Sequence, residues 1–114
     1  MRYLSTRGGM APQAFTDILL EGLAPDGGLA IPETIPQVTT AQLVAWRSLS
    51  YADLAYEILR LFVTDIPADD LRALTRAAYR PEVFGNEAIV PLKPIDGGVS
   101  LLQHSQRLRV QRHD

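Results

Sequence analysis

The sequence contains no cysteine, which excludes disulfide bonds, thiolate metal sites and cysteine nucleophiles within its 114 residues. An excess of one charge is also lacking, because 11 basic and 13 acidic residues leave a formal net charge of -2. This balance offers no broad attraction for nucleic acid or for an anionic membrane, so we expect neither as a partner. No apolar run is long enough to cross a bilayer, and arginines stand where a secretory signal needs apolar residues. We therefore expect a cytoplasmic protein.

Histidine is scarce, and the two that occur, His104 and His113, both lie in the polar final segment. Neither has a neighbour at metal-ligand spacing, so the pattern indicates surface histidines and we expect no metal site. Asp65, Asp69 and Asp70 could suggest a metal cluster, but carboxylates at the start of a helix also interact favourably with the helix dipole. We favour this second explanation.

Apolar residues make up 46% of the chain, which is enough to bury one core, and the length favours a single domain. Apolar positions at three- and four-residue spacing predict helices over residues 15–22, 41–46, 50–62 and 65–80. Short strands are predicted over residues 3–5, 29–31, 88–92 and 99–102. Because the helices outweigh the strands, the predicted fold class is α+β and mainly helical.

Burial of the apolar faces of the predicted helices should supply most of the stability. We expect Thr40 to cap the second helix, and Ser50 with Asp53 to begin the third. The side chains expected to face the core are Leu43, Val44, Trp46, Leu54, Ala55, Ile58, Leu59, Phe62, Leu71, Leu74, Ala78 and Tyr79.

A sharp reversal is predicted between the first helix and the second strand. Pro25 fixes one backbone angle, and Gly27 and Gly28 after Asp26 tolerate positive angles. The glycine spacing fits neither the nucleotide-binding nor the dinucleotide-binding signature, so Asp26, Gly27 and Gly28 are interpreted as a structural turn.

Three polar residues follow the first predicted strand. Ser5, Thr6 and Arg7 could bind an anion through their hydroxyls and guanidinium, although a strand end with one exposed arginine explains them equally well. They are our candidates for residues that face a substrate.

In order and spacing, these segments resemble the N-terminal domain of threonine synthase. The resemblance begins with Tyr3-Leu4-Ser5-Thr6-Arg7-Gly8, the helix from Phe15 and the stretch Ala24-Pro25-Asp26-Gly27-Gly28-Leu29-Ala30-Ile31-Pro32. It continues through 49–55, 58–62, 65–67 and 77–79 to Val90-Pro91-Leu92 and Leu101-Leu102. It therefore covers residues 1–102, which we expect to form one domain.

The resemblance implies a pyridoxal-phosphate enzyme that converts O-phosphohomoserine and water into threonine and phosphate. In that family the cofactor is held as a Schiff base by a lysine in a Gly-Pro-Thr-x-x-Phe-Lys-Asp segment, which follows the strand that corresponds to Leu101-Leu102. This chain has no such segment, and its only lysine, Lys93, precedes that strand. The resemblance therefore implies no catalytic or cofactor-binding residue here, and it implies the remaining catalytic domains as the partner.

Residues 103–114 depart from the family pattern and turn abruptly polar and basic. One hypothesis is a single-base change that shifted the reading frame and truncated a longer gene. A natural polar tail and a deliberately shortened chain are the alternatives. The nucleotide sequence of the gene distinguishes them.

Three functional hypotheses remain open from the sequence. The first is an N-terminal domain of threonine synthase that is inactive alone. The second is a non-catalytic interaction module with the same fold, and the third is a small enzyme that uses Arg7 and His104. A domain separated from its neighbours should expose a contiguous apolar patch, through which it could also self-associate, whereas a self-sufficient module should be polar.

Overall fold

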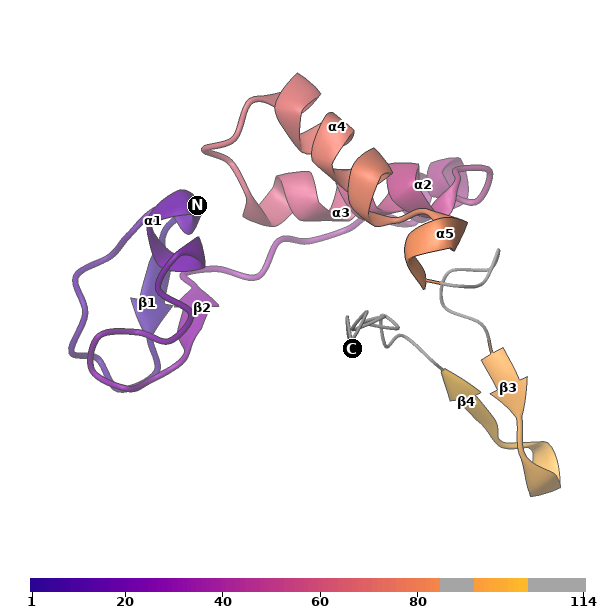
Figure 1. The fold of residues 1–114 in the computed structure, drawn as a ribbon, viewed down its shortest axis with the longest axis horizontal. Coiled ribbons are helices and arrows are strands. Elements are labelled where there is room, and N and C mark those ends of the chain that lie inside the picture. Colours follow the sequence, from indigo (N-terminus) through magenta and orange to yellow (C-terminus); the bar gives the residue numbers. More distant parts are fainter. Residues whose placement is uncertain (85–91, 103–114) are drawn as a thin grey trace, which may run out of the picture.

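The computed structural model describes residues 1–84 and 92–102 (Figure 1). The first lobe consists of strand β1 (Tyr3–Ser5), helix α1 (Phe15–Leu19) and strand β2 (Ala30–Pro32). The helices that follow are α2 (Thr40–Trp46), α3 (Tyr51–Phe62), α4 (Ala68–Ala78) and α5 (Pro81–Phe84). A hairpin then comprises β3 (Leu92–Pro94), the 3-10 turn Asp96–Gly98 and β4 (Ser100–Leu102). The predicted α+β, mainly helical class is confirmed.

Strands β1 and β2 form a two-stranded antiparallel sheet. Tyr3 lies opposite Pro32, Leu4 opposite Ile31 and Ser5 opposite Ala30. Proline has no backbone N–H to donate to a ladder, and within the described residues β2 has a strand partner on one side only. Pro32 is thus compatible with the edge position of β2.

Helix α1 is shorter than predicted. It ends at Leu19, and Leu20 is 90% exposed, so no buried contact holds a further turn at that point. Gly22 lies beyond the end of the helix, so the expected end at residue 22 is wrong, although its positive φ of 78° is a conformation that favours glycine.

Helix α2 begins at a different cap from the predicted one. Thr39, not Thr40, accepts a hydrogen bond from the Gln42 backbone N–H at 3.1 Å, and the Gln42 side chain accepts from the Thr39 N–H at 2.9 Å. This reciprocal capping box satisfies two donors at the helix start. Leu43 and Val44 are each 55% exposed, so the expectation that they face the core is wrong.

Helices α3 and α4 pack against each other and form the core. Ser50 caps α3 as predicted, since its hydroxyl accepts from the Asp53 N–H at 3.2 Å. The buried centre consists of Tyr56, Val63 and Leu71, with Phe15, Leu59, Phe62 and Ile66 packed around it.

The predicted buried faces of α3 and α4 were wider than the faces that the structure buries. Helix α4 buries Leu71 and Thr75, one turn apart, whereas Leu74 and Ala78, which share that face by their spacing, are exposed. Ile58 on α3 is also exposed, and Tyr56, absent from the predicted stripe, is buried. A short helix packed on one neighbour buries a narrower face than apolar spacing alone indicates.

The end of α4 also differs from the prediction. The helix predicted to reach residue 80 ends at Ala78, and Pro81 begins the short helix α5, at a position where the missing N–H of proline has no cost. Tyr79 stacks on Phe84 of α5, with ring centroids 5.6 Å apart. This contact joins the two helices.

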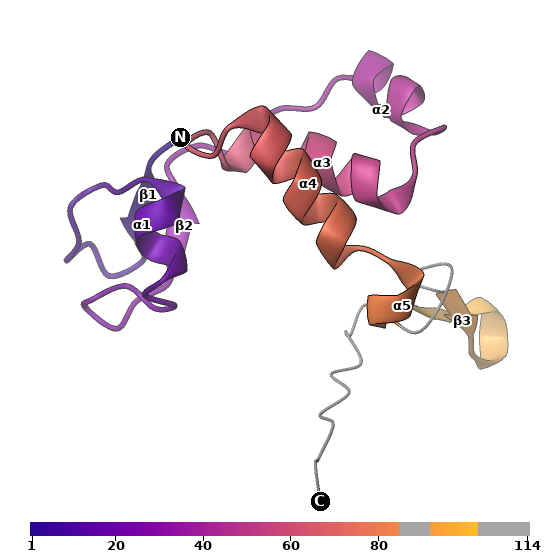
Figure 2. The same ribbon diagram turned by 45° about the horizontal axis from the view of Figure 1, so that its top comes forward.

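Strand β4 confirms the strand predicted over residues 99–102, whereas β3 shares only Leu92 with the strand predicted over residues 88–92. Leu92 lies opposite Leu102, Lys93 opposite Leu101 and Pro94 opposite Ser100. Residues 88–91 of the predicted strand lie outside the described residues, as do His104, His113 and the tail 103–114. Figures 1 and 2 both show the hairpin standing clear of α3 and α4.

Specific polar contacts join the first lobe to the end of α3. The Tyr3 hydroxyl donates to the Phe62 carbonyl at 2.6 Å. The Asp65 carboxylate accepts from the Thr16 N–H at 2.9 Å and from its hydroxyl at 2.6 Å, so it satisfies a donor in the first turn of α1.

None of the helices in the described ranges is long and apolar enough to cross a membrane.

Candidate functional site

A cluster of short hydrogen bonds surrounds the Asp26 side chain. Ser5 at the end of β1 donates its hydroxyl to the two carboxylate oxygens, at 2.6 and 2.8 Å. The Gly28 N–H donates to one oxygen at 2.9 Å, and the Gly9 N–H to the other at 2.8 Å. Asp26 therefore ties the β1 end, the following loop and its own turn together, which supports the prediction of a structural turn.

The three substrate-facing candidates lie together beside this turn. The Ser5 hydroxyl, which is buried, also accepts from the Arg7 N–H at 3.1 Å. The Thr6 hydroxyl accepts from the Leu29 N–H at 2.9 Å, and the Arg7 Nη1 donates to the Asp26 carbonyl at 3.1 Å. Both hydroxyls are engaged within the chain, whereas the exposed Arg7 guanidinium uses one of its five N–H donors in the bond described.

Two glycines of the turn are needed for different reasons. Gly27 has a φ of 81°, which side chains rarely adopt. A Cβ at the buried Gly28 would lie 2.5 Å from Ser5 Oγ and 2.9 Å from Thr6 Oγ1. Gly28 therefore allows the close approach of the strand and the turn.

The hydrogen bonds have an electrostatic consequence. The Ser5 hydroxyl, followed by the Gly28 N–H, lowers the pKa of Asp26 below its ordinary value. The Thr16 hydroxyl does the same for the pKa of Asp65. Burial, followed by the nearby charge of Asp65, raises the pKa of the Tyr3 phenol.

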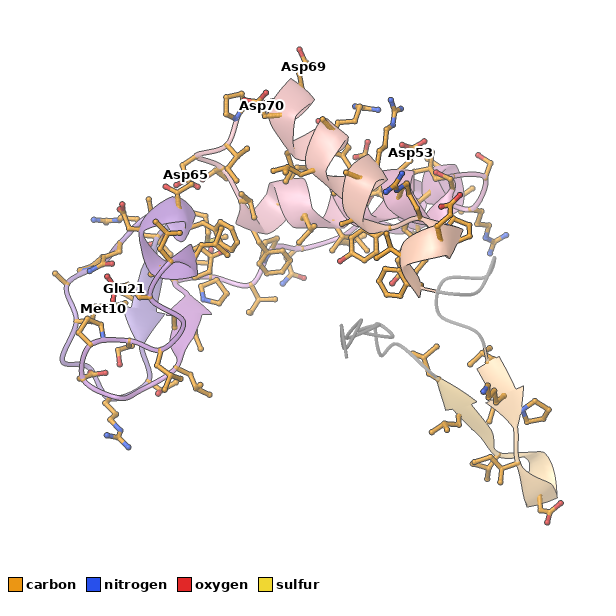
Figure 3. The ribbon with its side chains drawn as sticks, viewed as in Figure 1. Met10, Glu21, Asp53, Asp65, Asp69 and Asp70 are labelled. Carbon is orange, nitrogen blue, oxygen red and sulfur yellow. The ribbon has the colours of Figure 1, made fainter. Side chains whose placement is uncertain are left out.

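Of the three carboxylates considered as a metal cluster, Asp65 lies apart from Asp69 and Asp70. Figure 3 shows Asp69 pointing outward from the first turn of α4, while Asp65 lies beside α1. Asp69 and Asp70 occupy the first turn of α4, as the helix-dipole interpretation requires, whereas Asp65 binds Thr16. Over residues 1–84 and 92–102, no group of three or more metal-ligating side chains could hold an ion.

Lys93 lies in the exposed hairpin. It is the only lysine in the sequence, and it lies in strand β3, in which every residue is exposed. A pyridoxal-phosphate site needs a lysine held in place beside groups that bind the phosphate and the ring. The described surroundings of Lys93 do not fit this requirement.

An apolar groove of about 450 Å³ lies between the loop that precedes α2, helix α2 and helix α3. Its lining is almost entirely apolar, with Arg47 as its one charged residue. The lining residues are Pro36, Val38, Leu43, Trp46, Arg47, Leu54, Ile58, Leu61 and Phe62. Sequence reasoning assigned several of them to the core and so missed the groove, although their apolar character was the available signal.

Comparison with known proteins places this fold in a family. The family described as Threonine synthase N terminus matches residues 2–79. The chain is 47% identical to threonine synthase of Corynebacterium glutamicum, over 89% of this chain and 22% of that protein. It is 39% identical to threonine synthase of Pseudomonas aeruginosa, over 90% of this chain and 22% of that protein.

A solved structure agrees in sequence and in shape. The crystal structure of PLP-bound threonine synthase from Brucella melitensis matches with a TM-score of 0.78 and 41% identity, over 90% of this chain and 22% of that one. The chain thus has the fold of an N-terminal region of threonine synthases. It belongs to the threonine synthase N-terminus family, and it spans about a fifth of the length of the relatives it matches.

Proposed function

We propose that this chain serves as the N-terminal domain of a threonine synthase, the pyridoxal-phosphate enzyme that converts O-phospho-L-homoserine and water into L-threonine and phosphate. The family match and the identity to threonine synthases of several organisms support the proposal. The domain supplies a folded support against which the cofactor-binding part of such an enzyme packs.

The apolar groove is the structural observation that carries this proposal. A self-sufficient module should be polar on its surface, yet Leu43 and Ile58 of the groove are 55% and 41% exposed. An apolar hollow of this kind is typical of a surface that a neighbouring domain covers. The alternative of a free-standing interaction module is therefore the weaker one.

We further propose that the chain is inactive alone, because Lys93 lacks the surroundings of a cofactor lysine. Pyridoxal phosphate would be bound by the remaining domains. Of the three substrate-facing candidates, the Arg7 guanidinium is the group best able to reach an anionic substrate from this domain, since the Ser5 and Thr6 hydroxyls have partners in the chain.

A chimera tests the proposal. Residues 1–102 of this chain would replace the matched segment of Brucella melitensis threonine synthase, and phosphate release from O-phosphohomoserine would be measured. We expect activity well above that of the same enzyme with the segment deleted. A chimera that binds pyridoxal phosphate and remains inactive would contradict the proposal.

The isolated chain provides the matched experiment. Titration of the 114-residue chain with pyridoxal phosphate should give no stable Schiff-base absorbance band and no phosphate release. A specific band that disappears in Lys93→Arg would show that the inference about Lys93 is wrong.

A further inference from the structure

The hairpin of β3 and β4 has apolar side chains on both faces. Side chains alternate across a strand, so Leu92 and Leu102 share one face and Leu101 lies on the other. Leu92 is 67% exposed, and Ile95, Val99, Leu101 and Leu102 are each more than half exposed. A two-stranded hairpin is marginally stable without further packing. The hairpin therefore has the apolar composition of a buried pair of strands, although its side chains are exposed.

The register shows which backbone groups point outward. The Ile95 N–H donates to the Val99 carbonyl at 2.7 Å, which makes 95 and 99 a hydrogen-bonded pair. Such pairs alternate along an antiparallel ladder, so Lys93 and Leu101 form the next one. The N–H groups of residues 92, 94, 100 and 102 accordingly point away from the partner strand.

The two outer edges of the hairpin are not equivalent. On β3 the outward position 94 is a proline, which has no N–H to donate, so this edge is blunted. On β4 both Ser100 and Leu102 retain an outward N–H and carbonyl. No further strand pairs with this edge within the described parts of the chain.

We propose that the outer edge of β4 accepts a strand from the catalytic part of a threonine synthase, so that the hairpin becomes part of a larger sheet. This inference rests on the proposed function. The family's N-terminal match ends at residue 79, whereas the matches to whole threonine synthases extend over about 90% of the chain. The hairpin thus lies beyond the N-terminal family match, on the side toward the four-fifths of a relative that this chain does not span. Main-chain pairing would supply the affinity, and the exposed leucines would be covered by the same partner.

Hydrogen exchange in the active chimera provides the direct test. We expect the amides of Ser100 and Leu102 to exchange roughly 100-fold more slowly in the chimera than in the isolated chain. The Leu101 amide points toward β3, so its exchange in the two proteins serves as the internal reference. Fast exchange at Ser100 and Leu102 in an active chimera would overturn the inference and leave the proposed function standing.

Two proline variants distinguish pairing at the outer edge of β4 from pairing at the outer edge of β3. Leu102→Pro removes an outward donor of β4, and Leu92→Pro, at the directly opposite residue, removes one of β3. In the chimera, Leu102→Pro should reduce the protection of the Ser100 amide about tenfold, while Leu92→Pro leaves it unchanged. Equal effects would overturn the assignment of the edge.

The remaining outcomes are also decisive. A chimera that neither binds pyridoxal phosphate nor releases phosphate contradicts the proposed function and, with it, this inference. Protection of Leu102 in the isolated chain that rises with protein concentration would identify a second copy as the occupant, and would overturn the assignment to the catalytic part.

Discussion

The tripeptide Asp-Gly-Gly occurs twice in this chain, at residues 26–28 and 96–98, and the two copies have opposite surroundings. The Asp26 carboxylate accepts hydrogen bonds from a hydroxyl and two backbone N–H groups, and Gly28 is buried. Around the second copy, a Cβ at Gly97 or Gly98 would meet no atom of the described residues within 4 Å, and both flanking strands are exposed. The same three residues therefore reverse the chain in both places, but only the first copy makes hydrogen bonds to residues distant in the sequence.

This difference separates two kinds of stability in the molecule. In the first lobe, polar groups distant in sequence satisfy one another, so the turn is supported from within the chain. In the hairpin, the apolar side chains and the open edge of β4 have no such support among the described residues. The first copy belongs to a completed structure, and the second belongs to a surface that we infer is completed by the rest of an enzyme.

The largest expected effect comes from adding a methyl group to the first turn. Gly28→Ala places a Cβ 2.5 Å from Ser5 Oγ, so we expect a loss of about 3 kcal/mol in the free energy of unfolding. Gly97→Ala meets only the cost of a positive φ, about 1–2 kcal/mol. Urea unfolding of the full chain, followed by circular dichroism, measures both.

Gly22→Ala is the matched control within the first lobe. Gly22 has a φ of 78°, but a Cβ there would meet nothing within 4 Å. Its cost should resemble that of Gly97→Ala. If Gly22→Ala and Gly28→Ala destabilise equally, close approach is not the reason for glycine at position 28.

The second expected effect is on the acid dependence of stability. The pKa of Asp26 is lower in the folded chain, so its contribution is present above the unfolded pKa and is lost as the pH falls through the folded value. Asp26→Asn should therefore be less stable at neutral pH and should lose less stability below about pH 4. Unfolding free energies between pH 6 and pH 2, as approximate limits, measure this slope.

Asp96→Asn is the control, since it changes the same residue type in the exposed copy of the turn. Its free energy of unfolding at neutral pH should change less than that of Asp26→Asn. Some acid dependence should persist in Asp26→Asn, because the pKa of Asp65 is also lowered, by its bonds to Thr16. A parallel pH profile for Asp26→Asn and the unmodified chain would show that the Asp26 hydrogen bonds do not distinguish the two turns.

Local signals in the sequence predicted much of this structure. The strand at Tyr3–Ser5, the Ser50 cap and the turn at residues 26–28 depend on neighbouring residues, and each lies where the sequence predicted it. The cap of α2 was misplaced by one residue because two adjacent threonines can both cap a helix. The reciprocal bond with Gln42 decides between them.

Burial could not be predicted from the same patterns. Apolar spacing shows which face of a helix avoids water, but not whether the covering atoms belong to this chain or to another part of an enzyme. Leu43, Val44 and Leu74 were assigned to the core for this reason and are exposed. The Asp26 cluster was missed as a network because Gly9 donates through its backbone, which no residue type reveals.

A smaller effect on stability is expected from removing the hydroxyl of Ser5, which contacts the first turn, or of Ser100, which follows the second. Ser5→Ala removes a buried hydroxyl that donates to Asp26 and accepts from the Arg7 N–H, so we expect a loss of about 2 kcal/mol. Ser100→Ala, on the exposed strand β4, should change the free energy of unfolding by less than about 0.5 kcal/mol. Equal losses in urea unfolding would contradict the contrast between a supported and an unsupported turn.

Among the variants of the first lobe, the smallest effect on stability is expected for Arg7→Ala. Its guanidinium is exposed and makes one bond to the Asp26 carbonyl, so Arg7→Ala should cost the isolated chain less than about 1 kcal/mol. If Arg7 also faces the substrate, as proposed, the same change in the active chimera raises the KM for O-phosphohomoserine, while kcat changes little. Arg7→Lys keeps the charge and should restore part of the affinity. An unchanged KM in Arg7→Ala would assign the residue to the turn alone, and the first Asp-Gly-Gly copy would then be purely structural.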